Sequence, residues 1–213
     1  MLNEALLLDS TRPVSKQNNT IGCPEHSSQG VPFSCLEPDN DKNCWYVLRV
    51  SYSRELKVKA VLDEMGVKAF VPMVWRKKIV DGKAEKKLVP AVGNLCFVLW
   101  NRKGIDAFIS GYGEKSPVHY YWDRTANRPM AVPEKEMSDF MTVASTMDED
   151  LIYLTEISDK LREGQTVKVR SGSFAGVTGR IVRIRKSRRI MVELPGMLAV
   201  ASTFVKPENV EII

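Results

Sequence analysis

The sequence predicts an α+β N-terminal domain followed by a small all-β barrel. Residues 45–50 and 95–100 are apolar runs with the length of buried strands, and the chain between them has helical and hairpin patterns. The last part of the chain, residues 164–213, differs because short alternating segments are separated by glycine-rich or charged turns. Several short strands within so few residues are typical of a small barrel.

The first helix is predicted directly after the first strand. Its apolar residues recur at the spacing of one helix face: Val58, Val61, Leu62 and Met65. Ser53 is placed to accept backbone N–H bonds as the N-cap, and Glu55 lies in the first turn. Gly66 follows, at the point where a left-handed residue commonly ends a helix.

A hairpin and further strands complete the predicted sheet. Strands are expected at residues 69–71, 74–75 and 88–89. The dipeptide Asp81-Gly82 suits a two-residue hairpin turn, because both turn positions need a positive φ.

Beyond residue 100, the sequence predicts two helices and two short strands. One helix ends at Gly111, and strands are expected at residues 118–122 and 130–132. The second helix is expected to start with Pro133 at its first position. Its apolar face contains four residues: Met137, Phe140, Met141 and Ala144.

Five strands are predicted for the barrel: residues 166–170, 180–185, 189–194, 198–204 and 210–212. The same segment contains Gly172, Gly176, Gly179 and Pro195. In a helix each interior glycine costs about 1 kcal/mol and proline about 3 kcal/mol. We therefore predict a permanent β-barrel rather than a segment that refolds as helix.

These patterns divide the chain into four parts. Residues 1–43 form a polar N-terminal extension that is expected to be flexible. Residues 44–145 form the α+β domain, residues 146–163 an acidic linker, and residues 164–213 the barrel. A flexible linker predicts that the barrel leaves the surface of the first domain open.

The charge distribution favours an acidic partner. The formal net charge is +5 and the pI is about 9.0. Residues 54–103 contain twelve Lys and Arg against five Asp and Glu, and residues 164–192 contain eight against none. Such segments indicate a nucleic-acid or other acidic partner. The chain shows no membrane-spanning run and no export signal, so we expect a cytoplasmic monomer.

No motif predicts an enzyme or a cofactor. Cys23, His26, Cys35 and Cys44 are too widely spaced for paired zinc ligands, so we expect no metal site. His119 lies among tyrosines and lacks a nucleophile partner, which favours a packing or hydrogen-bonding role. The sequence has no phosphate-binding glycine loop and no nucleophile elbow.

The barrel sequence resembles a KOW motif. It contains Val167-Lys168-Val169, then Gly172, and then the run Phe174-Ala175-Gly176-Val177-Thr178-Gly179. The glycines permit a tight turn between two strands, and Phe174 is expected to fill one end of the barrel. KOW motifs occur in SH3-like barrels of NusG-type elongation factors and of some ribosomal proteins.

The first domain resembles the N-terminal domain of the NusG family. Trp45-Tyr46-Val47-Leu48 is followed by a lysine-rich helix, a hairpin, and Pro90 shortly before Phe97-Val98. The resemblance covers residues 44–213 and implies a NusG N-terminal-like antiparallel sheet with flanking helices, joined to a KOW barrel.

Residues 119–137 resemble the UpxY-type paralogs, which are specialised antiterminators of capsular-polysaccharide operons. The stretches that carry this resemblance are Tyr120-Tyr121-Trp122-Asp123 and residues 128–137. Housekeeping members carry an aromatic-Pro-Gly-aromatic stretch before the central strand, whereas this chain has Val89-Pro90-Ala91-Val92-Gly93-Asn94.

The resemblance implies that Trp45, Tyr46 and Phe97 form or support the depression that receives the clamp helices of RNA polymerase. The alternative is that these residues are ordinary core. Alternate strand residues face opposite sides, so we expect one of Trp45 and Tyr46 on the helix-covered face and the other on an open face.

Basic residues are candidates for binding nucleic acid. Arg54, Lys57 and Lys59 begin the first helix, which the resemblance places near the non-template DNA strand. A solvated helix face is the alternative. The hairpin also carries five basic residues: Arg76, Lys77, Lys78, Lys86 and Lys87. The alternatives for these hairpin residues are that they also bind nucleic acid or that they protect a strand edge from aggregation.

The resemblance implies a transcription elongation or antitermination factor that binds polymerase, together with non-template DNA or nascent RNA. The barrel residues Phe174, Gly176, Gly179, Arg183 and Arg185 would then form the barrel and its partner surface, with Rho or a ribosomal small-subunit protein as candidate partners. Two alternatives remain: a ribosome-associated RNA-binding protein that uses the barrel, and a housekeeping NusG.

Overall fold

A computed structural model describes residues 41–213, except 81–82, 157–163, 185, 195 and 205. By chain contacts, the described residues belong to one compact unit. The predictions for the N-terminal extension up to residue 40, and for Cys23, His26 and Cys35, lie outside the described residues. The predicted fold class is confirmed, since an α+β domain precedes a strand-rich domain.

The N-terminal sheet is antiparallel and centred on β1. Its strands are β1 (Cys44–Val50), β2 (Lys68–Phe70), β5 (Leu95–Trp100), β6 (Val118–Tyr120) and β9 (Ala131–Val132). They lie in the order β2-β5-β1-β6, and β9 also pairs with β1. Since β1 pairs with β5 on one side and with β6 and β9 on the other, the predicted apolar strands are the sheet centre.

The two faces of this sheet belong to two hydrophobic cores. Tyr46 and Leu48 pack with residues of α1 (Glu55–Glu64) and α2 (Arg102–Gly111). Trp45 and Val47 pack with residues of α3 (Glu134–Ala144). Successive side chains of β1 point to opposite faces of the sheet, and both faces are buried. This explains why the strand is a continuous apolar run in the sequence.

Helix α1 begins differently from the prediction. Ser53 is not the N-cap: it ends a 3-10 turn, η2 (Ser51–Ser53), with a φ of 51°, and Arg54 takes the N-cap position without a side-chain hydrogen bond. The Ser53 N–H instead donates to Asn94 Oδ1 at 3.3 Å. Gly66 has a φ of 73°, as the predicted helix end requires.

Helix α2 ends at Gly111, as predicted, and α3 differs from the prediction only at its start. Helix α2 begins at Arg102 because the Asn101 side chain accepts from the Gly104 N–H at 2.7 Å. Pro133 is the N-cap of α3 rather than its first residue. A 3-10 turn, η3 (Gly113–Lys115), follows α2, and β7 (Trp122–Asp123) pairs with β8 (Arg128–Pro129).

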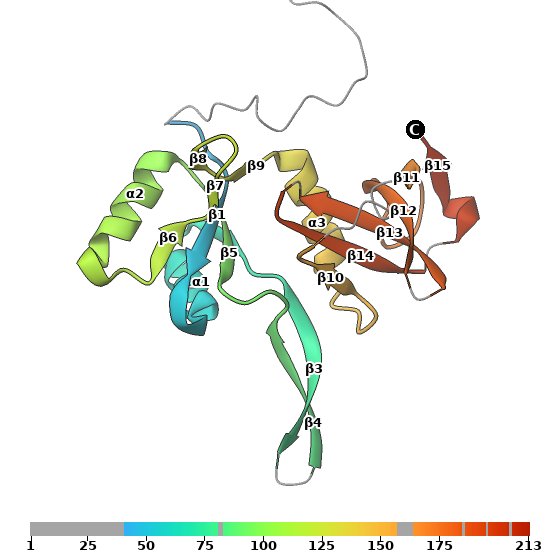
Figure 1. Ribbon diagram of the computed structural model, residues 1–213, viewed down its shortest axis with the longest axis horizontal. Coiled ribbons are helices and arrows are strands. Elements are labelled where there is room, and N and C mark those ends of the chain that lie inside the picture. Colours follow the sequence, from blue (N-terminus) through green and yellow to red (C-terminus); the bar gives the residue numbers. More distant parts are fainter. Residues whose placement is uncertain (1–40, 81–82, 157–163, 185, 195, 205) are drawn as a thin grey trace, which may run out of the picture. The chain divides into compact units, whose positions relative to one another are not determined.

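The hairpin is a two-stranded ribbon that is longer than predicted. Strand β3 (Met73–Val80) pairs with β4 (Lys83–Pro90) along its whole length and with no other strand in the described chain. Figure 1 shows both strands extending beyond the sheet that carries them. The predicted turn, Asp81-Gly82, lies outside the described residues.

The barrel sheet has six strands, one more than predicted. The predicted strands are β11 (Thr166–Val169), β12 (Thr178–Ile184), β13 (Ser187–Leu194), β14 (Leu198–Phe204) and β15 (Val210–Ile212). A 3-10 turn, η4 (Pro207–Asn209), precedes β15. The additional strand is β10 (Ile152–Leu154), which pairs with β14. The barrel sheet thus extends into the region expected to be linker, part of which lies outside the described residues.

Glycine has a specific role at two barrel positions. Gly176 has a φ of 87°, which L side chains rarely adopt, so it supports the predicted turn. Gly179 lies in β12, where an added Cβ would approach Ile190 Cγ2 and Met191 O to 2.7 Å. Glycine is therefore needed at position 179 for close packing between β12 and β13 rather than for a turn.

Candidate functional site

The three aromatic residues proposed to contact polymerase are all buried. Trp45 is 2% exposed, and Tyr46 and Phe97 are fully buried. Trp45 and Phe97 share one core, whereas Tyr46 lies in the core on the opposite face of the sheet. The predicted alternation of Trp45 and Tyr46 holds, but the prediction of an open face is wrong because α3 residues cover it.

An aromatic cluster fills the covered face. The ring centroids of Phe97 and Phe140 are 5.8 Å apart, and Phe70 lies 6.4 Å from Phe97 and 6.3 Å from Phe140. Tyr153 of β10 is 6.5 Å from Phe140 and donates its hydroxyl to Met73 O at 3.4 Å. Burial raises the pKa of Tyr153 to about 12. A barrel strand therefore completes a cluster that begins in the N-terminal sheet.

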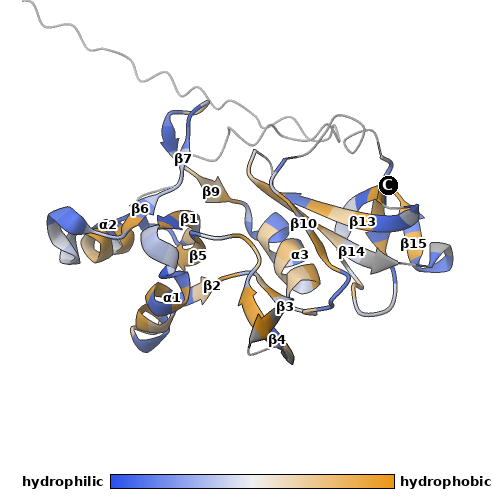
Figure 2. Cartoon of the chain, turned by 60° about the horizontal axis from the view of Figure 1, so that its bottom comes forward, coloured by the Kyte–Doolittle hydropathy of each residue, from blue (hydrophilic) through white to orange (hydrophobic). Residues whose placement is uncertain are grey.

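Helix α3 contacts both domains. It touches β1 in the N-terminal sheet and β13 and β14 in the barrel, and Figure 2 shows it between these strands with apolar residues along its length. One hydrophobic core contains Phe97, Phe140 and the barrel residues Val192 and Val200. The prediction that the barrel leaves this surface open is therefore wrong in the described structure.

A buried carboxylate adds a polar contact between α3 and the barrel. Asp139, 6% exposed, accepts from the Thr178 N–H at 3.2 Å and forms an ion pair with Lys135 at 2.5 Å. The Lys135 ammonium also donates to Gly176 O at 3.4 Å. The Asp139 carboxylate thus has partners on its own helix and on the barrel backbone, which a buried charge requires.

Further polar contacts hold the segment that connects the two domains. Arg189 of β13 donates from Nη1 to Asp150 O at 2.7 Å and to Ser202 O at 2.8 Å. Glu149 pairs with Lys86 of the hairpin, and this contact lowers the pKa of the Glu149 carboxyl. Both Glu149 and Asp150 belong to the acidic segment expected to be linker.

The candidate DNA-binding residues on α1 differ in exposure. Arg54 and Lys57 are exposed, while Lys59 is partly buried and forms an ion pair with Asp63 at 2.5 Å. The Arg54 guanidinium lies 5.5 Å from the ring centre of Tyr52, which is 81% exposed. Sequence reasoning did not predict a role for Tyr52. Its position next to a basic helix start was the available signal, since exposed aromatic rings can stack on bases.

The barrel candidates differ in their surroundings. Phe174 is half-buried and packs against the shared core, so it does not fill the barrel end completely. Arg183 is exposed on β12, and Arg185 lies outside the described residues. Arg170 pairs with Glu211 across β11 and β15 at 2.8 Å, which lowers the pKa of the Glu211 carboxyl.

The described residues contain no group of three His, Cys, Asp or Glu side chains suited to holding a metal ion. His119 is exposed on β6, so the predicted packing role is wrong and the hydrogen-bonding role stays a prediction. Between residues 41 and 213, with the gaps stated above, no helix is both long and apolar enough to span a membrane.

Comparisons with known proteins agree with this architecture. Residues 43–141 match the family model described as transcription termination factor nusG, and residues 163–193 match the KOW motif. No curated protein matches the sequence. A solved structure titled "Domain interaction in Thermotoga maritima NusG" is 18% identical, covering 82% of this chain and 99% of that chain at a TM-score of 0.39. The two family matches, in the order in which the fold places them, support the NusG family for this chain.

Proposed function

We propose that this protein is a transcription elongation and antitermination factor that binds RNA polymerase in the elongation complex. The observation that carries the proposal is the match to the nusG model over residues 43–141, followed by the KOW match over residues 163–193. Proteins of the NusG family generally bind RNA polymerase and act without catalysis.

The polymerase surface in this proposal is the α3 side of the N-terminal domain. Trp45 and Phe97 support it from behind, because both are buried against the core that contains Phe140. Tyr46 stabilises the opposite face of the sheet. Since the barrel contacts α3, polymerase binding would require the barrel to leave α3.

The non-template DNA strand would lie at the start of α1. Arg54 and Lys57 are exposed there and supply charge for phosphates, and the exposed Tyr52 ring supplies a stacking surface. Lys59 contributes less, because Asp63 already neutralises its charge.

The required effect on polymerase is small. A factor that bridges the two sides of the polymerase cleft disfavours the open, paused state, and a difference in binding free energy of about 1.4 kcal/mol between the two states shifts their ratio tenfold. The finer proposal is action at polysaccharide-biosynthesis operons, which rests on the UpxY-like residues 119–137.

Binding to halted elongation complexes tests the function. The purified full chain is added to bacterial elongation complexes, and we expect co-migration with polymerase, a shorter pause lifetime and more read-through at terminators. Capture of ribosomal RNA without polymerase would instead support the ribosome-associated alternative.

A matched pair of variants tests the DNA contact. We expect Arg54→Gln with Lys57→Gln to weaken recruitment, whereas Lys115→Gln with Arg124→Gln removes the same charge at two other exposed positions and leaves recruitment unchanged. If both variants weakened recruitment equally, the basic residues at the start of α1 would be ordinary solvated surface rather than a DNA contact. The finer proposal is tested by comparing templates that carry polysaccharide-operon leaders with other leaders.

A further inference from the structure

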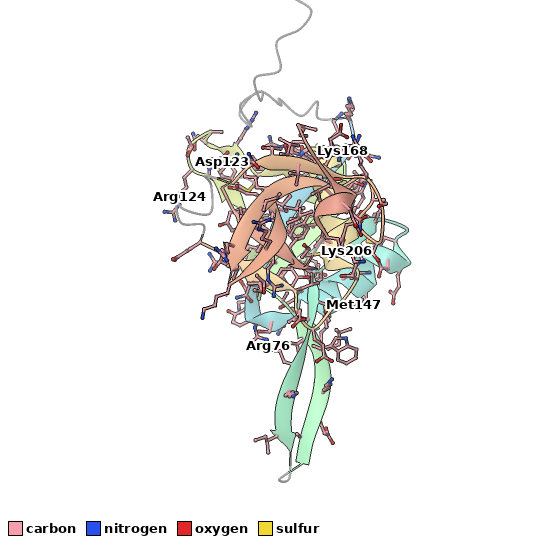
Figure 3. All side chains as sticks on the ribbon, turned by 90° about the vertical axis from the view of Figure 1, so that its right-hand side faces the viewer. Arg76, Asp123, Arg124, Met147, Lys168 and Lys206 are labelled. Atoms are coloured by element: carbon pink, nitrogen blue, oxygen red, sulfur yellow. The ribbon has the colours of Figure 1, made fainter. Side chains whose placement is uncertain are left out.

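The β3–β4 ribbon carries a group of exposed charges that the proposed function does not use. The ribbon consists of two strands only. Its exposed residues include Trp75 at 41% and Ile79 at 76% exposure, and the basic side chains Arg76, Lys77, Lys86 and Lys87. We call these four basic residues the basic belt. Figure 3 shows Arg76 near the base of the ribbon, where the strands leave the domain.

The strand register places like charges directly opposite each other. Arg76 pairs with Lys87, and Lys77 pairs with Lys86 on the adjacent rung. Like charges at opposed positions of an antiparallel pair destabilise it. Two such pairs in succession, in a ribbon with no third strand, weaken the hairpin unless an anion lies against it.

The structure already places one anion on the basic belt. The Glu149 carboxylate pairs with Lys86, and the charge of Lys77 also contributes to lowering the pKa of Glu149. Among the described residues no other carboxylate forms an ion pair with a belt residue. Most of the positive charge on the basic belt therefore faces solvent.

We propose that the β3–β4 ribbon binds double-helical nucleic acid by lying in its major groove. A two-stranded ribbon has the width that this groove admits. Alternation puts Arg76 and Lys87 on one face of the ribbon and Lys77 and Lys86 on the other. A ribbon in the major groove turns one face to the base edges and has a phosphate backbone along each of its two edges, within reach of long basic side chains from both strands, whereas a single strand supplies only one backbone.

The exposed apolar residues fit the same partner. Trp75 and Ile79 share the face of Lys77, because they lie at every second position of β3. Apolar side chains in the major groove contact thymine methyl groups and give A·T preference. The proposal is independent of polymerase binding, since it concerns the affinity of the free protein for a duplex.

The test measures binding of the full chain to a short fluorescein-labelled DNA duplex by anisotropy, over a series of salt concentrations. The belt variant is Arg76→Gln, Lys77→Gln, Lys87→Gln. The control variant is Lys115→Gln, Arg124→Gln, Lys186→Gln, which removes the same charge at exposed positions outside the ribbon. We expect the belt variant to lose about tenfold or more in affinity, with the salt slope reduced by about one for each removed charge.

A second variant tests the role of Glu149. Glu149→Gln frees Lys86, so duplex affinity should rise rather than fall. The charge-preserving variant Arg76→Lys, Lys87→Arg should bind as the unchanged protein does. We also expect the belt variant to be at least as heat-stable as the original chain, because it lacks the opposed like charges, and this separates lost binding from lost fold.

Three outcomes would overturn the proposal. Equal affinity losses in the belt and control variants would mean that only net charge matters. Tighter binding of the corresponding single strand, lost in the belt variant, would assign the ribbon to single strands. Self-association of the belt variant with duplex affinity unchanged would show that the charges only protect a strand edge.

Discussion

Individual side chains in this protein are constrained most tightly where two strands approach closely. Gly179 of β12 has no Cβ, and Ile190 and Met191 of β13 occupy the space that a Cβ would need. In contrast, a Cβ added at Gly93 would meet no atom within 4 Å. The two glycines therefore offer a direct comparison of a packing requirement with an unconstrained position.

Gly179→Ala should lower the free energy of unfolding by about 1–3 kcal/mol, because the added methyl group overpacks the β12–β13 contact. Gly93→Ala, the control, should stay within about 0.5 kcal/mol of the original chain. Urea unfolding followed by circular dichroism measures both values. Equal stability of the two variants would show that the barrel adjusts at no cost.

At the scale of elements, α3 is unusual because both domains cover it. Its buried side chains include Phe140, in the aromatic cluster, and Asp139, which bonds the barrel. Glu136 lies on the same helix, and its Oε2 atom is buried without a hydrogen-bond partner among the described groups. Burial, and secondarily the charge of Asp139, raise the pKa of the Glu136 carboxyl.

This raised pKa predicts how stability depends on pH. A carboxyl whose pKa is higher in the folded protein binds protons more readily there, so its contribution falls as pH rises through the window between the unfolded and folded values. Glu136→Gln removes that penalty. We expect a higher melting temperature for the variant at neutral pH, and a gain that disappears below the ordinary glutamate pKa of about 4.3.

Glu134→Gln is the control for this effect, since Glu134 is exposed in the first turn of the same helix. It loses a favourable interaction with the helix N-terminus and should give no gain at neutral pH. A melting-temperature difference for Glu136→Gln that does not change with pH would contradict the assignment.

At the scale of the whole described unit, the two domains share a core through α3 and β10. Apolar side chains of both domains form one core, and the bond from the Thr178 N–H to Asp139 adds a directional contact. The closed arrangement thus combines apolar burial with one buried carboxylate that has partners on both sides.

Asp139→Ala should open the α3–barrel contact, because the Thr178 N–H loses its acceptor and an unsatisfied buried group costs about 1–3 kcal/mol. Hydrogen exchange at the Thr178 amide should accelerate by about tenfold or more. Ser138→Ala changes an exposed residue of the same helix and should change this exchange little. If the proposed function holds, Asp139→Ala should also bind elongation complexes more tightly. Unchanged exchange in Asp139→Ala would refute the directional contact.

Much of the fold could be predicted from local patterns, and the errors have identifiable causes. Ser53 has the right residue type for an N-cap, but Asn94, distant in sequence, accepts its N–H and sets a different turn. Strand β10 is short and only partly buried, so its three residues give no clear period. Its pairing with β14 decides its conformation.

The candidate site was predictable only in part. Alternation along β1 required Trp45 and Tyr46 to face opposite sides, and they do. The burial of Trp45 by α3 and the barrel could not be predicted from the sequence, because both segments lie far along the chain from Trp45. The basic residues of the hairpin were visible in the sequence, yet their opposition as like-charge pairs depends on the β3–β4 register.

The sequence by itself determined the order of the elements, the strand character of β1 and β5, and the β-barrel at the end of the chain, because these follow from local periodicity, glycine and proline. Only the tertiary structure decided that the barrel packs on α3 and that Tyr153 completes the aromatic cluster around Phe140. The physical reason is that apolar burial is not directional. An apolar face is visible in a sequence, but which distant segment covers it depends on the shape and register of both surfaces.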